Sequence, residues 1–346
     1  MGLDSRKLAI LQAIIDDYIL TATPVGSRTI SKRIGMGLSS ATIRNEMSDL
    51  HELGLLEQPH TSAGRIPSDK AYRLYVNNIM SRSALSDEEA QFIKKHYDEK
   101  LSDIEDVIKQ TANVLSSMTH YISMALTPSF NTIKLRRIQL IKISETRALA
   151  IIITDIGVMK DAVIRLPTGI DDSQLEKLSN MLTKKYMNRK LTEAGSVLLK
   201  ELQNTLSDHR EFLDSVATVL LNVSKSRKTN FELSGTTNIL LFPEYSDVLK
   251  ARQLIDAIEG RDLLYDILDN AKKVEFSITI GSENESLDMQ DCSVVTATYR
   301  IGGETMGSFG VIGPKRMDYS KILAILSYMG ESLSNILTTM FEEDEE

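Results

Sequence analysis

The chain has 346 residues, a net charge of −8, and a composition of 42% hydrophobic and 25% charged residues. This length predicts two or three domains of an ordinary globular protein, with a core large enough to need no disulfide or metal. The single cysteine, Cys292, excludes a disulfide framework and an all-cysteine zinc site. Charged residues interrupt the first twenty positions, which argues against the apolar segment of a secretory signal peptide. The longest apolar run, 148–153, is far shorter than a membrane-spanning segment, which needs about 18 residues. We therefore expect a cytoplasmic protein with no membrane partner.

Residues 1–80 differ in charge from the rest of the chain. They hold nine Lys and Arg against eight Asp and Glu, whereas the remaining residues hold 31 against 40. Within them, residues 26–45 carry four basic side chains and no acidic one: Arg28, Lys32, Arg33 and Arg44. This asymmetry indicates an anionic partner for the N-terminal part of the chain. Four basic residues close together in the sequence are, however, also typical of an ordinary solvated surface.

The first 80 residues predict short helices and a hairpin. In chain order these are a helix that stops before Thr23-Pro24, a helix capped by Ser27 and ended by Gly35, a helix capped by Ser39 or Ser40 and running to Leu53, a strand at 55–58, a turn-rich loop at 60–67 that could return as a second strand, and a helix capped by Ser68. The second and third helices, with the Gly-containing turn between them, have the lengths and turn chemistry of a helix-turn-helix. With the hairpin added, the pattern is that of a winged helix-turn-helix DNA-binding domain.

The third helix has two distinct sides. At 100° per residue, Ile43, Met47 and Leu50 share one side and form a core stripe. The opposite side is small and polar, with Arg44 and Asn45 near its N-terminal end. Small residues allow close approach to a DNA groove, while Arg and Asn offer the guanine and adenine pairings. A surface helix with a merely solvated outer face would show the same periodicity, so this alternative stays open.

The hairpin tip supports the DNA-binding interpretation. It carries a lone arginine, Arg65, in a flexible stretch suited to a minor groove or a phosphate, although a plain solvent-exposed tip is an alternative. The N-terminus of the third helix offers backbone N–H groups to phosphate. The candidate DNA-binding residues are Arg28, Lys32, Ser40, Ala41, Thr42, Arg44, Asn45, Ser48, Thr61, Ser62 and Arg65.

Beyond residue 85 the pattern changes to an α+β domain with a helical insertion. The expected elements are a long helical stretch from Asp87 to about Leu126, strands at 138–143, 148–154 and 158–166, helix from 171 to about 226, an extended segment at 231–242, helices at 246–259 and 261–270, strands at 274–280, 293–301 and 305–312, and a closing helix at 318–341.

The sequence lacks the stronger catalytic signatures. It has no phosphate loop and no H-E-x-x-H, and its five histidines share no metal-ligand spacing. Cys292 precedes an expected strand, which favours a buried thiol over a reactive one. We therefore expect no catalytic residues, cofactor or metal. An enzyme built on the central α+β domain is the competing hypothesis from another functional class.

Seven blocks of the sequence carry a resemblance to a known family: Ser39–Met47, Gly54–Pro67, Asp69–Arg73, Ser234–Asn238, Pro243–Tyr245, Ile280–Asn284 and Gly313–Tyr319. Together they closely resemble the bacterial heat-inducible transcription repressor HrcA family. They are spread over nearly the whole chain, although residues 171–230 carry no motif that resembles the family.

The resemblance implies an α+β multidomain protein. It implies a winged-helix domain at 1–80, a discontinuous GAF-like domain at 81–170 and 235–346, and an inserted, mainly helical dimerisation domain at 171–234. It also implies a repressor of chaperone operons that binds an inverted-repeat operator, CIRCE, with the chaperonin GroEL as modulator.

An inverted repeat calls for a two-fold homodimer, which we expect to form through 171–230, on double-stranded DNA in the bacterial nucleoid. The alternative regulator is a winged-helix transcription factor that senses a small molecule through the GAF-like domain.

Overall fold

The computed structural model describes residues 3–33, 37–60, 63–81, 83–97, 103–128, 134–155, 159–167, 169–203, 210–225, 231–301 and 303–343. Its contacts divide the chain into two compact units, Met1–Thr127 with Phe231–Ser334 and Pro128–Asn230 with Asn335–Glu346. We call them the first and second units. None of the helices in the described ranges is long and apolar enough to span a membrane.

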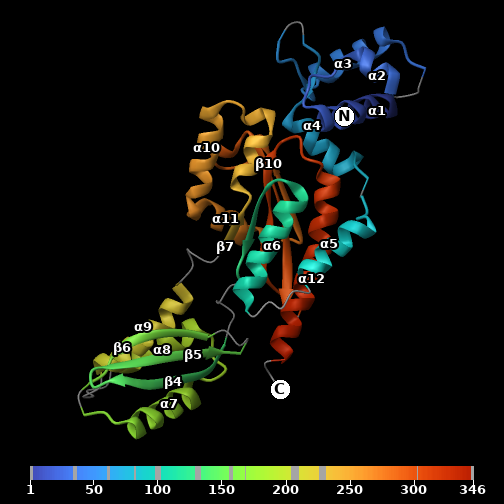
Figure 1. Cartoon of the computed structure of the whole chain (residues 1–346). Coiled ribbons are helices and arrows are strands. Elements are labelled where there is room, and N and C mark those ends of the chain that lie inside the picture. The colour runs from blue at the N-terminus through green and yellow to red at the C-terminus, as the bar shows by residue number, and fades with distance from the viewer. Residues whose placement is uncertain are drawn as a thin grey trace. The chain divides into compact units, whose positions relative to one another are not determined.

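The first unit begins with a winged helix-turn-helix (Figure 1). Its elements are α1 (Ser5–Thr21), α2 (Ser27–Arg33), α3 (Ser40–Glu52), β1 (Leu56–Glu57), β2 (Ile66–Pro67) and α4 (Asp69–Leu74), which a π-helical turn, Tyr75–Ile79, continues. The predicted helices and hairpin are confirmed, with Ser68 capping α4 by accepting a hydrogen bond from the Ala71 amide. Ser27 is the first residue of α2 rather than its cap, and Gly35 lies outside the described residues.

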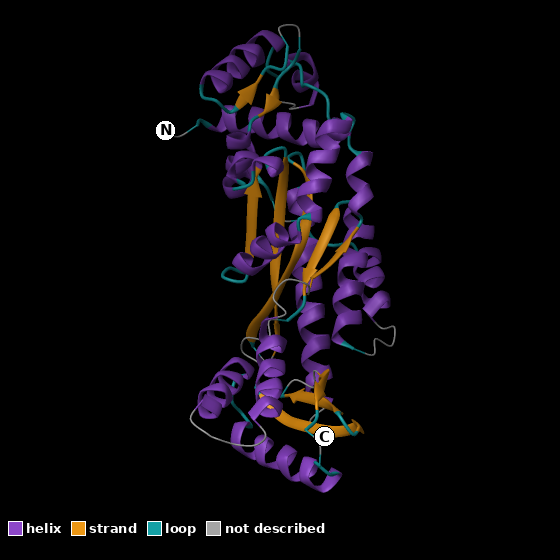
Figure 2. Cartoon of the chain, turned by 90° about the vertical axis from the view of Figure 1, so that its left-hand side faces the viewer, coloured by secondary structure: helices purple, strands orange, loops and turns teal. Residues whose placement is uncertain are grey.

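The rest of the first unit is a five-stranded antiparallel sheet with helices on both faces (Figures 1 and 2). Its elements are α5 (Asp87–Tyr97), α6 (Ile104–Thr119), β3 (Ile122–Leu126), β7 (Phe231–Ser234), 3-10 turns at Thr236–Leu241 and Pro243–Tyr245, α10 (Val248–Glu259), α11 (Arg261–Ala271), β8 (Phe276–Ile280), β9 (Cys292–Ile301), β10 (Glu304–Pro314) and α12 (Tyr319–Glu343). From Asn335 onwards, the residues of α12 are assigned to the second unit. The strand order is β7-β3-β10-β9-β8. A buried cluster that includes Met124, Leu254 and Leu264 joins the sheet to α10 and α11.

Two sequence-based assignments in this part are wrong. The sequence predicts the end of a long helix at 122–126, but these residues form β3, an interior strand between β7 and β10. The helix ends at His120, whose left-handed backbone caps it, and all five residues of β3 are buried. A short apolar run buried on both sides has no periodicity that separates strand from helix. Of the extended segment expected at 231–242, only Phe231–Ser234 is a strand.

The second unit contains a three-stranded antiparallel meander and three helices. These are β4 (Leu135–Ser144), β5 (Arg147–Thr154), β6 (Met159–Arg165), α7 (Asp172–Tyr186), α8 (Leu191–Gln203) and α9 (Arg210–Lys225). The sequence analysis assigned these strands to the GAF-like segment 81–170, whereas the observed division falls at Thr127 and Phe231. Side chains of α7 explain the difference: the Ser179 and Thr183 hydroxyls accept hydrogen bonds from the backbone amides of Leu140 and Ile138, at 2.9 and 3.0 Å. This helix therefore covers the edge of β4 and joins the strands to the helical segment.

The wing is attached to the helices by one backbone bridge. The amide of Val25 donates to the carbonyl of Arg65 at 2.8 Å, and the amide of Arg65 donates back at 2.9 Å. A Cβ atom at Gly64 would overlap the Val25 carbonyl oxygen, so this close approach requires glycine.

We predict that Gly64→Ala weakens this bridge by about 1–3 kcal/mol, the usual cost of overpacking. Amide hydrogen exchange at Val25 and Arg65 should accelerate by at least about tenfold, because local opening becomes easier. Gly26→Ala is the matched control, since a Cβ there has nothing within 4 Å. Equal protection in both variants would contradict the prediction.

Candidate nucleic-acid interface

The two faces of α3 differ as the sequence predicts. Ile43 and Leu50 are fully buried and Met47 is 5% exposed, so these three anchor the helix in the core. The four residues of the opposite face are exposed: Ala41, Arg44, Asn45 and Ser48. The helix thus presents a small polar surface with one guanidinium and one amide, which matches the chemistry of base-edge recognition. Contact of these side chains with DNA remains a prediction.

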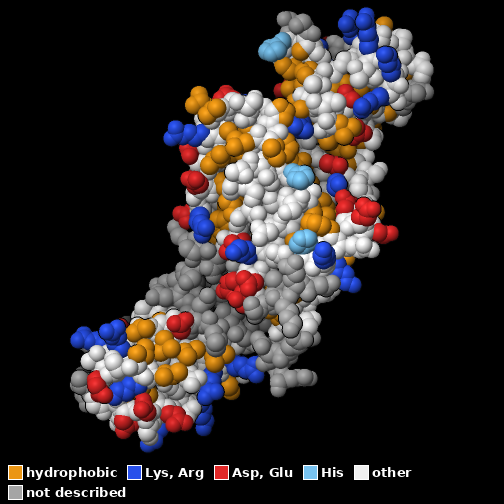
Figure 3. Space-filling view, in the orientation of Figure 1, with side chains coloured by type: hydrophobic (Ala, Val, Ile, Leu, Met, Phe, Trp, Pro, Cys, Tyr) orange, Lys and Arg blue, Asp and Glu red, His pale blue; other side chains and the backbone are white. Residues whose placement is uncertain are grey.

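Exposed basic side chains also lie on the neighbouring helix α2. Arg28 and Lys32 are exposed on α2, which packs against α3. Figure 3 shows Lys and Arg side chains gathered over the helices α1–α3 of this domain. Such a distribution attracts a phosphate backbone independently of its sequence.

The N-terminus of α3 is capped by Ser39 rather than Ser40. The Ser39 hydroxyl oxygen accepts the Thr42 amide at 3.1 Å and lies 3.0 Å from the Thr42 hydroxyl. Ser40 is the first helical residue and is half-buried. The Thr42 amide is therefore already satisfied, which leaves fewer first-turn amides for phosphate than the sequence analysis assumed.

Basic residues of α1 neutralise two of the three acidic residues of α3, Glu46 and Asp49. Glu46 is only 6% exposed, and its carboxylate pairs with Arg6 at 2.6 Å and with Lys7 at 2.7 Å. Lys7 also pairs with Asp49 at 2.9 Å. These pairs fix α3 against α1 and reduce the negative charge close to the polar face. The sequence analysis missed this role of Glu46, although its position three residues after Ile43 could have suggested it.

The wing presents Arg65 less freely than its sequence suggests. The backbone of Arg65 is held in the bridge to Val25, and its side chain is half-buried with an Nε atom that has no hydrogen-bond partner among the described residues. The other two predicted wing residues, Thr61 and Ser62, lie outside the described residues.

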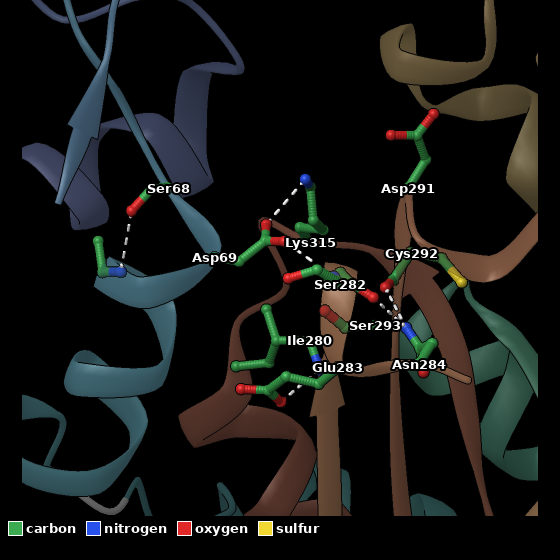
Figure 4. A network of polar contacts seen from close by, with 12 residues as sticks. Ser68, Asp69, Ile280, Ser282, Glu283, Asn284, Asp291, Cys292, Ser293 and Lys315 are labelled. Carbon is green, nitrogen blue, oxygen red and sulfur yellow. Dashed lines mark hydrogen bonds and ion pairs between the residues drawn. The ribbon is translucent and has the colours of Figure 1, made fainter. Parts of the chain in front are cut away.

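Two ion pairs of opposite polarity connect α4 to the five-stranded sheet, and Figure 4 shows the first, between Asp69 and Lys315. Asp69 pairs with Lys315 at 2.8 Å and accepts a hydrogen bond from the Ser282 amide at 2.9 Å. One turn later, Arg73 pairs with Glu283 and donates to the carbonyl of Ile278 at 2.6 Å. We call this set the α4 junction.

The α4 junction depends on a close approach at Gly281. Its φ is +53°, and an added Cβ would overlap the carboxylate of Asp69. Only glycine combines this left-handed backbone with room for the carboxylate. The segments 280–284 and 313–319 that resemble the family thus supply Ser282, Glu283 and Lys315 to the junction.

The junction also shifts the ionisation of its carboxylates. Burial raises the pKa of Asp69, but the Lys315 ammonium and the Ser282 amide together outweigh it and bring that pKa below its ordinary value. The Arg73 guanidinium lowers the pKa of Glu283 in the same way. Both carboxylates therefore stabilise the junction in their ionised form.

A second set of contacts supports the same attachment. Arg316 pairs with Glu244 and donates to the carbonyl of Ile19, at the end of α1, at 3.0 Å. The rings of Tyr72 and Tyr319 lie 6.1 Å apart, and the buried Tyr72 hydroxyl has no partner in the described part of the chain. This interface therefore contains charged, aromatic and unsatisfied polar groups. Separating the N-terminal helices from the sheet costs less free energy than it would if the interface were an apolar core.

The candidate reactive residue is inert in this structure. Burial raises the pKa of Cys292 to about 12, and its Sγ donates to the Met289 carbonyl at 3.0 Å. The prediction of a buried thiol is confirmed. Among the described residues, no group of three or more His, Cys, Asp or Glu side chains could hold a metal ion.

Comparison with known proteins identifies relatives over the whole chain. The family model described as "Winged helix-turn-helix transcription repressor, HrcA DNA-binding" matches residues 3–80, and "HrcA protein C terminal domain" matches residues 105–323. The heat-inducible transcription repressor HrcA of Thermoanaerobacter pseudethanolicus is 38% identical over 346 residues, covering 99% of this chain and 100% of the relative. The repressor of the same name from Clostridioides difficile is 41% identical over 332 residues, covering 95% and 98%.

One solved structure shares the fold. A crystal structure described as that of a hypothetical protein has a TM-score of 0.65 and 24% identity, covering 98% of this chain and all of the other.

We predict that Arg44→Ala and Asn45→Ala each weaken binding to an inverted-repeat operator by about 1–3 kcal/mol and relax base preference, because each side chain is expected to pair with a base edge. Arg252→Ala, which removes an exposed arginine from α10, is the matched control and should leave affinity unchanged. Fluorescence anisotropy of a labelled operator, titrated with each purified and folded variant, measures the affinity. Unchanged affinity in both α3 variants would exclude this face as the base-reading surface.

We predict that Asp69→Asn destabilises the protein at pH 7 by about 0.5–1 kcal/mol, a value that allows for partial solvent screening of the pair. Because the folded pKa of Asp69 lies below its unfolded value near ~4, the contribution is present above about pH 5 and is lost as pH falls through the folded pKa. The stability difference from the native chain should therefore shrink on acidification. Urea unfolding at several pH values tests this.

Asp172→Asn is the control for that experiment. Asp172 holds the corresponding first position of α7 and is exposed. A loss of stability in Asp69→Asn that stays constant down to about pH 3 would contradict the assigned role of its carboxylate.

Proposed function

Because the chain belongs to the HrcA family of heat-inducible transcription repressors, with the family's winged helix-turn-helix DNA-binding domain at residues 3–80, we propose that it represses chaperone operons by binding the inverted-repeat operator CIRCE as a homodimer. The exposed polar face of α3, held by a fully buried opposite side, is the observation that carries this proposal.

The proposed DNA contacts divide by chemistry. The polar face of α3 enters the major groove and reads the edges of the DNA bases. The basic side chains of α2, together with the first turn of α3, bind the phosphate backbone. The wing residue Arg65 contacts a phosphate or the minor groove, with Thr61 and Ser62 beside it in the sequence. The complete proposed set is Arg28, Lys32, Ser40, Ala41, Thr42, Arg44, Asn45, Ser48, Thr61, Ser62 and Arg65.

The homodimer is proposed to form through the second unit, where the sequence analysis placed it in the helical segment 171–230. The support is an exposed apolar face on the meander of that unit: Ile141, Ile143 and Val163 are 41%, 55% and 58% exposed. The register places Ile141 opposite Leu149 and Leu149 opposite Val163, so these side chains form a row across β4, β5 and β6. Figure 3 shows hydrophobic side chains gathered over this sheet. Apolar surface of this kind is typical of a protein contact.

The remaining parts of the proposal follow from the family. The five-stranded sheet with helices on both faces is the proposed GAF-like domain, and the second unit is the proposed inserted dimerisation domain. The chaperonin GroEL is the proposed modulator, acting in the cytoplasm on a protein that associates with the nucleoid through its operator. A repressor that senses a small molecule through the GAF-like domain is the alternative.

A gel-shift titration on an inverted-repeat operator tests the function. We expect the native chain to shift the repeat as a dimer, with more repressor bound in the presence of chaperonin and less as temperature rises. The double variant Ile143→Glu with Val163→Glu should sediment as a monomer and lose at least about tenfold in operator affinity, because charge at the apolar face opposes association. Val248→Glu, at an exposed apolar residue of α10, is the matched control.

The outcomes separate the two parts of the proposal. A native chain with no preference for the inverted repeat over unrelated DNA would refute the repressor assignment. A double variant that stays dimeric would refute the placement of the dimer contact on the β4–β6 face.

A further inference from the structure

A cavity of about 250 Å³ lies in the first unit between α11, strands β8 and β9, and the connection that joins them. Its apolar lining includes Leu263, Ile267 and Met289. Its charged lining residues are all acidic: Asp266, Glu283 and Glu285. The cavity is somewhat smaller than the roughly 300–1,000 Å³ that drug-sized ligands occupy, so it suits a small ligand.

Asn284 shapes the cavity rather than binding a ligand. The two N–H groups of its amide are shared among the carbonyls of Gly281, Met289 and Cys292, which lie 3.0, 2.9 and 3.0 Å from the amide nitrogen. Its oxygen accepts the Thr279 hydroxyl at 2.7 Å. Figure 4 shows Asn284 pointing from the β8–β9 connection towards the start of β9. This saturated side chain fixes the connection that carries Glu283 and Glu285.

Three other polar groups of the lining are available to a ligand. Asp266 and Glu285 form no ion pair within the described ranges, where no lysine, arginine or histidine lines the cavity. Thr296 is only 2% exposed, and its hydroxyl has no hydrogen-bond partner among the residues that the structure describes. Its methyl group faces β10, since a Cβ at Gly310 would lie 2.9 Å from it. A hydroxyl with no partner in the protein is free to form a hydrogen bond with a ligand in the cavity.

From this lining we propose that the cavity binds a small aliphatic amine. The ammonium group would pair with the carboxylates of Asp266 and Glu285 and donate to the Thr296 hydroxyl, while its short carbon chain would pack on Leu263, Ile267 and Met289. A neutral ligand would forgo the charge pairing, and an anion would be repelled by the acidic lining.

The cavity is connected to the DNA-binding domain through Glu283. This residue lines the cavity and also pairs with Arg73 of α4 in the α4 junction. An ammonium group in the cavity competes with Arg73 for the same carboxylate, so occupancy weakens the junction. Coupling between two sites is reciprocal, and removal of Arg73 must therefore strengthen amine binding.

The test uses 1,4-diaminobutane as probe and 1,4-butanediol as its neutral counterpart of equal length. Calorimetric titration of the full chain at fixed ionic strength should show one saturable site for the diamine and at least tenfold weaker binding of the diol. Asp266→Asn and Glu285→Gln should each weaken diamine binding at least fivefold. Glu259→Gln, which removes an exposed carboxylate of α10, should leave it unchanged.

The coupling has its own measurement. Arg73→Ala should tighten diamine binding severalfold, because Glu283 is then free to pair with the ligand. In the operator assay, the diamine should reduce DNA binding more for the native chain than for Glu285→Gln, because the variant binds the diamine more weakly. Any direct effect of the diamine on the DNA is the same for both proteins and cancels in this comparison. This last comparison rests on the proposed function, whereas the titrations need no DNA.

Two kinds of result would overturn the proposal, one for the site and one for its link to α4. Equal affinity for diamine and diol, or equal weakening by Glu259→Gln and the cavity variants, would show non-specific attraction and remove the site. Unchanged or weaker diamine binding in folded Arg73→Ala would remove the link to α4. If Asp266→Asn fails to fold, Glu285→Gln and the diol comparison still decide the proposal.

Discussion

The burial of one side of α3 is the constraint on which the rest of the DNA-binding surface depends. Ile43, Met47 and Leu50 hold the helix in the core, and the carboxylate of Glu46 joins them there because Arg6 and Lys7 neutralise it. A helix fixed in this way has no rotational freedom left, so its small polar side must face solvent. The same ion pairs remove negative charge from the neighbourhood of that face, which favours approach to a phosphate backbone.

The α4 junction gives the DNA-binding domain an adjustable attachment. Its ion pairs are partly exposed, so each contributes little stability and responds to pH and to competing charges. An apolar interface of the same area would be more stable, but its stability would not change with pH or with competing charges. Glu283 belongs both to the junction and to the lining of the acidic cavity, so the proposed coupling between cavity and α4 acts through this carboxylate.

The two proposed recognition surfaces use opposite physical effects. The face of α3 is polar and has exposed basic residues on the neighbouring helix α2, which suits a charged, hydrated partner. The row Ile141, Leu149 and Val163 across the meander is apolar, which suits another protein surface. The proposed DNA-reading face belongs to the first unit and the proposed dimer face to the second, so each is tested by its own substitutions.

The sequence by itself determined the winged helix-turn-helix, the two faces of α3 and the burial of Cys292, because helical periodicity, caps and turn residues act over a few neighbouring positions. The tertiary structure alone decided that 122–126 is an interior strand of the sheet and that the β4–β6 meander packs with α7–α9. It also brought Asp69 and Arg73 to Lys315 and Glu283, more than two hundred positions away. Such pairings depend on which distant surfaces become buried together, and local patterns carry no information about that choice.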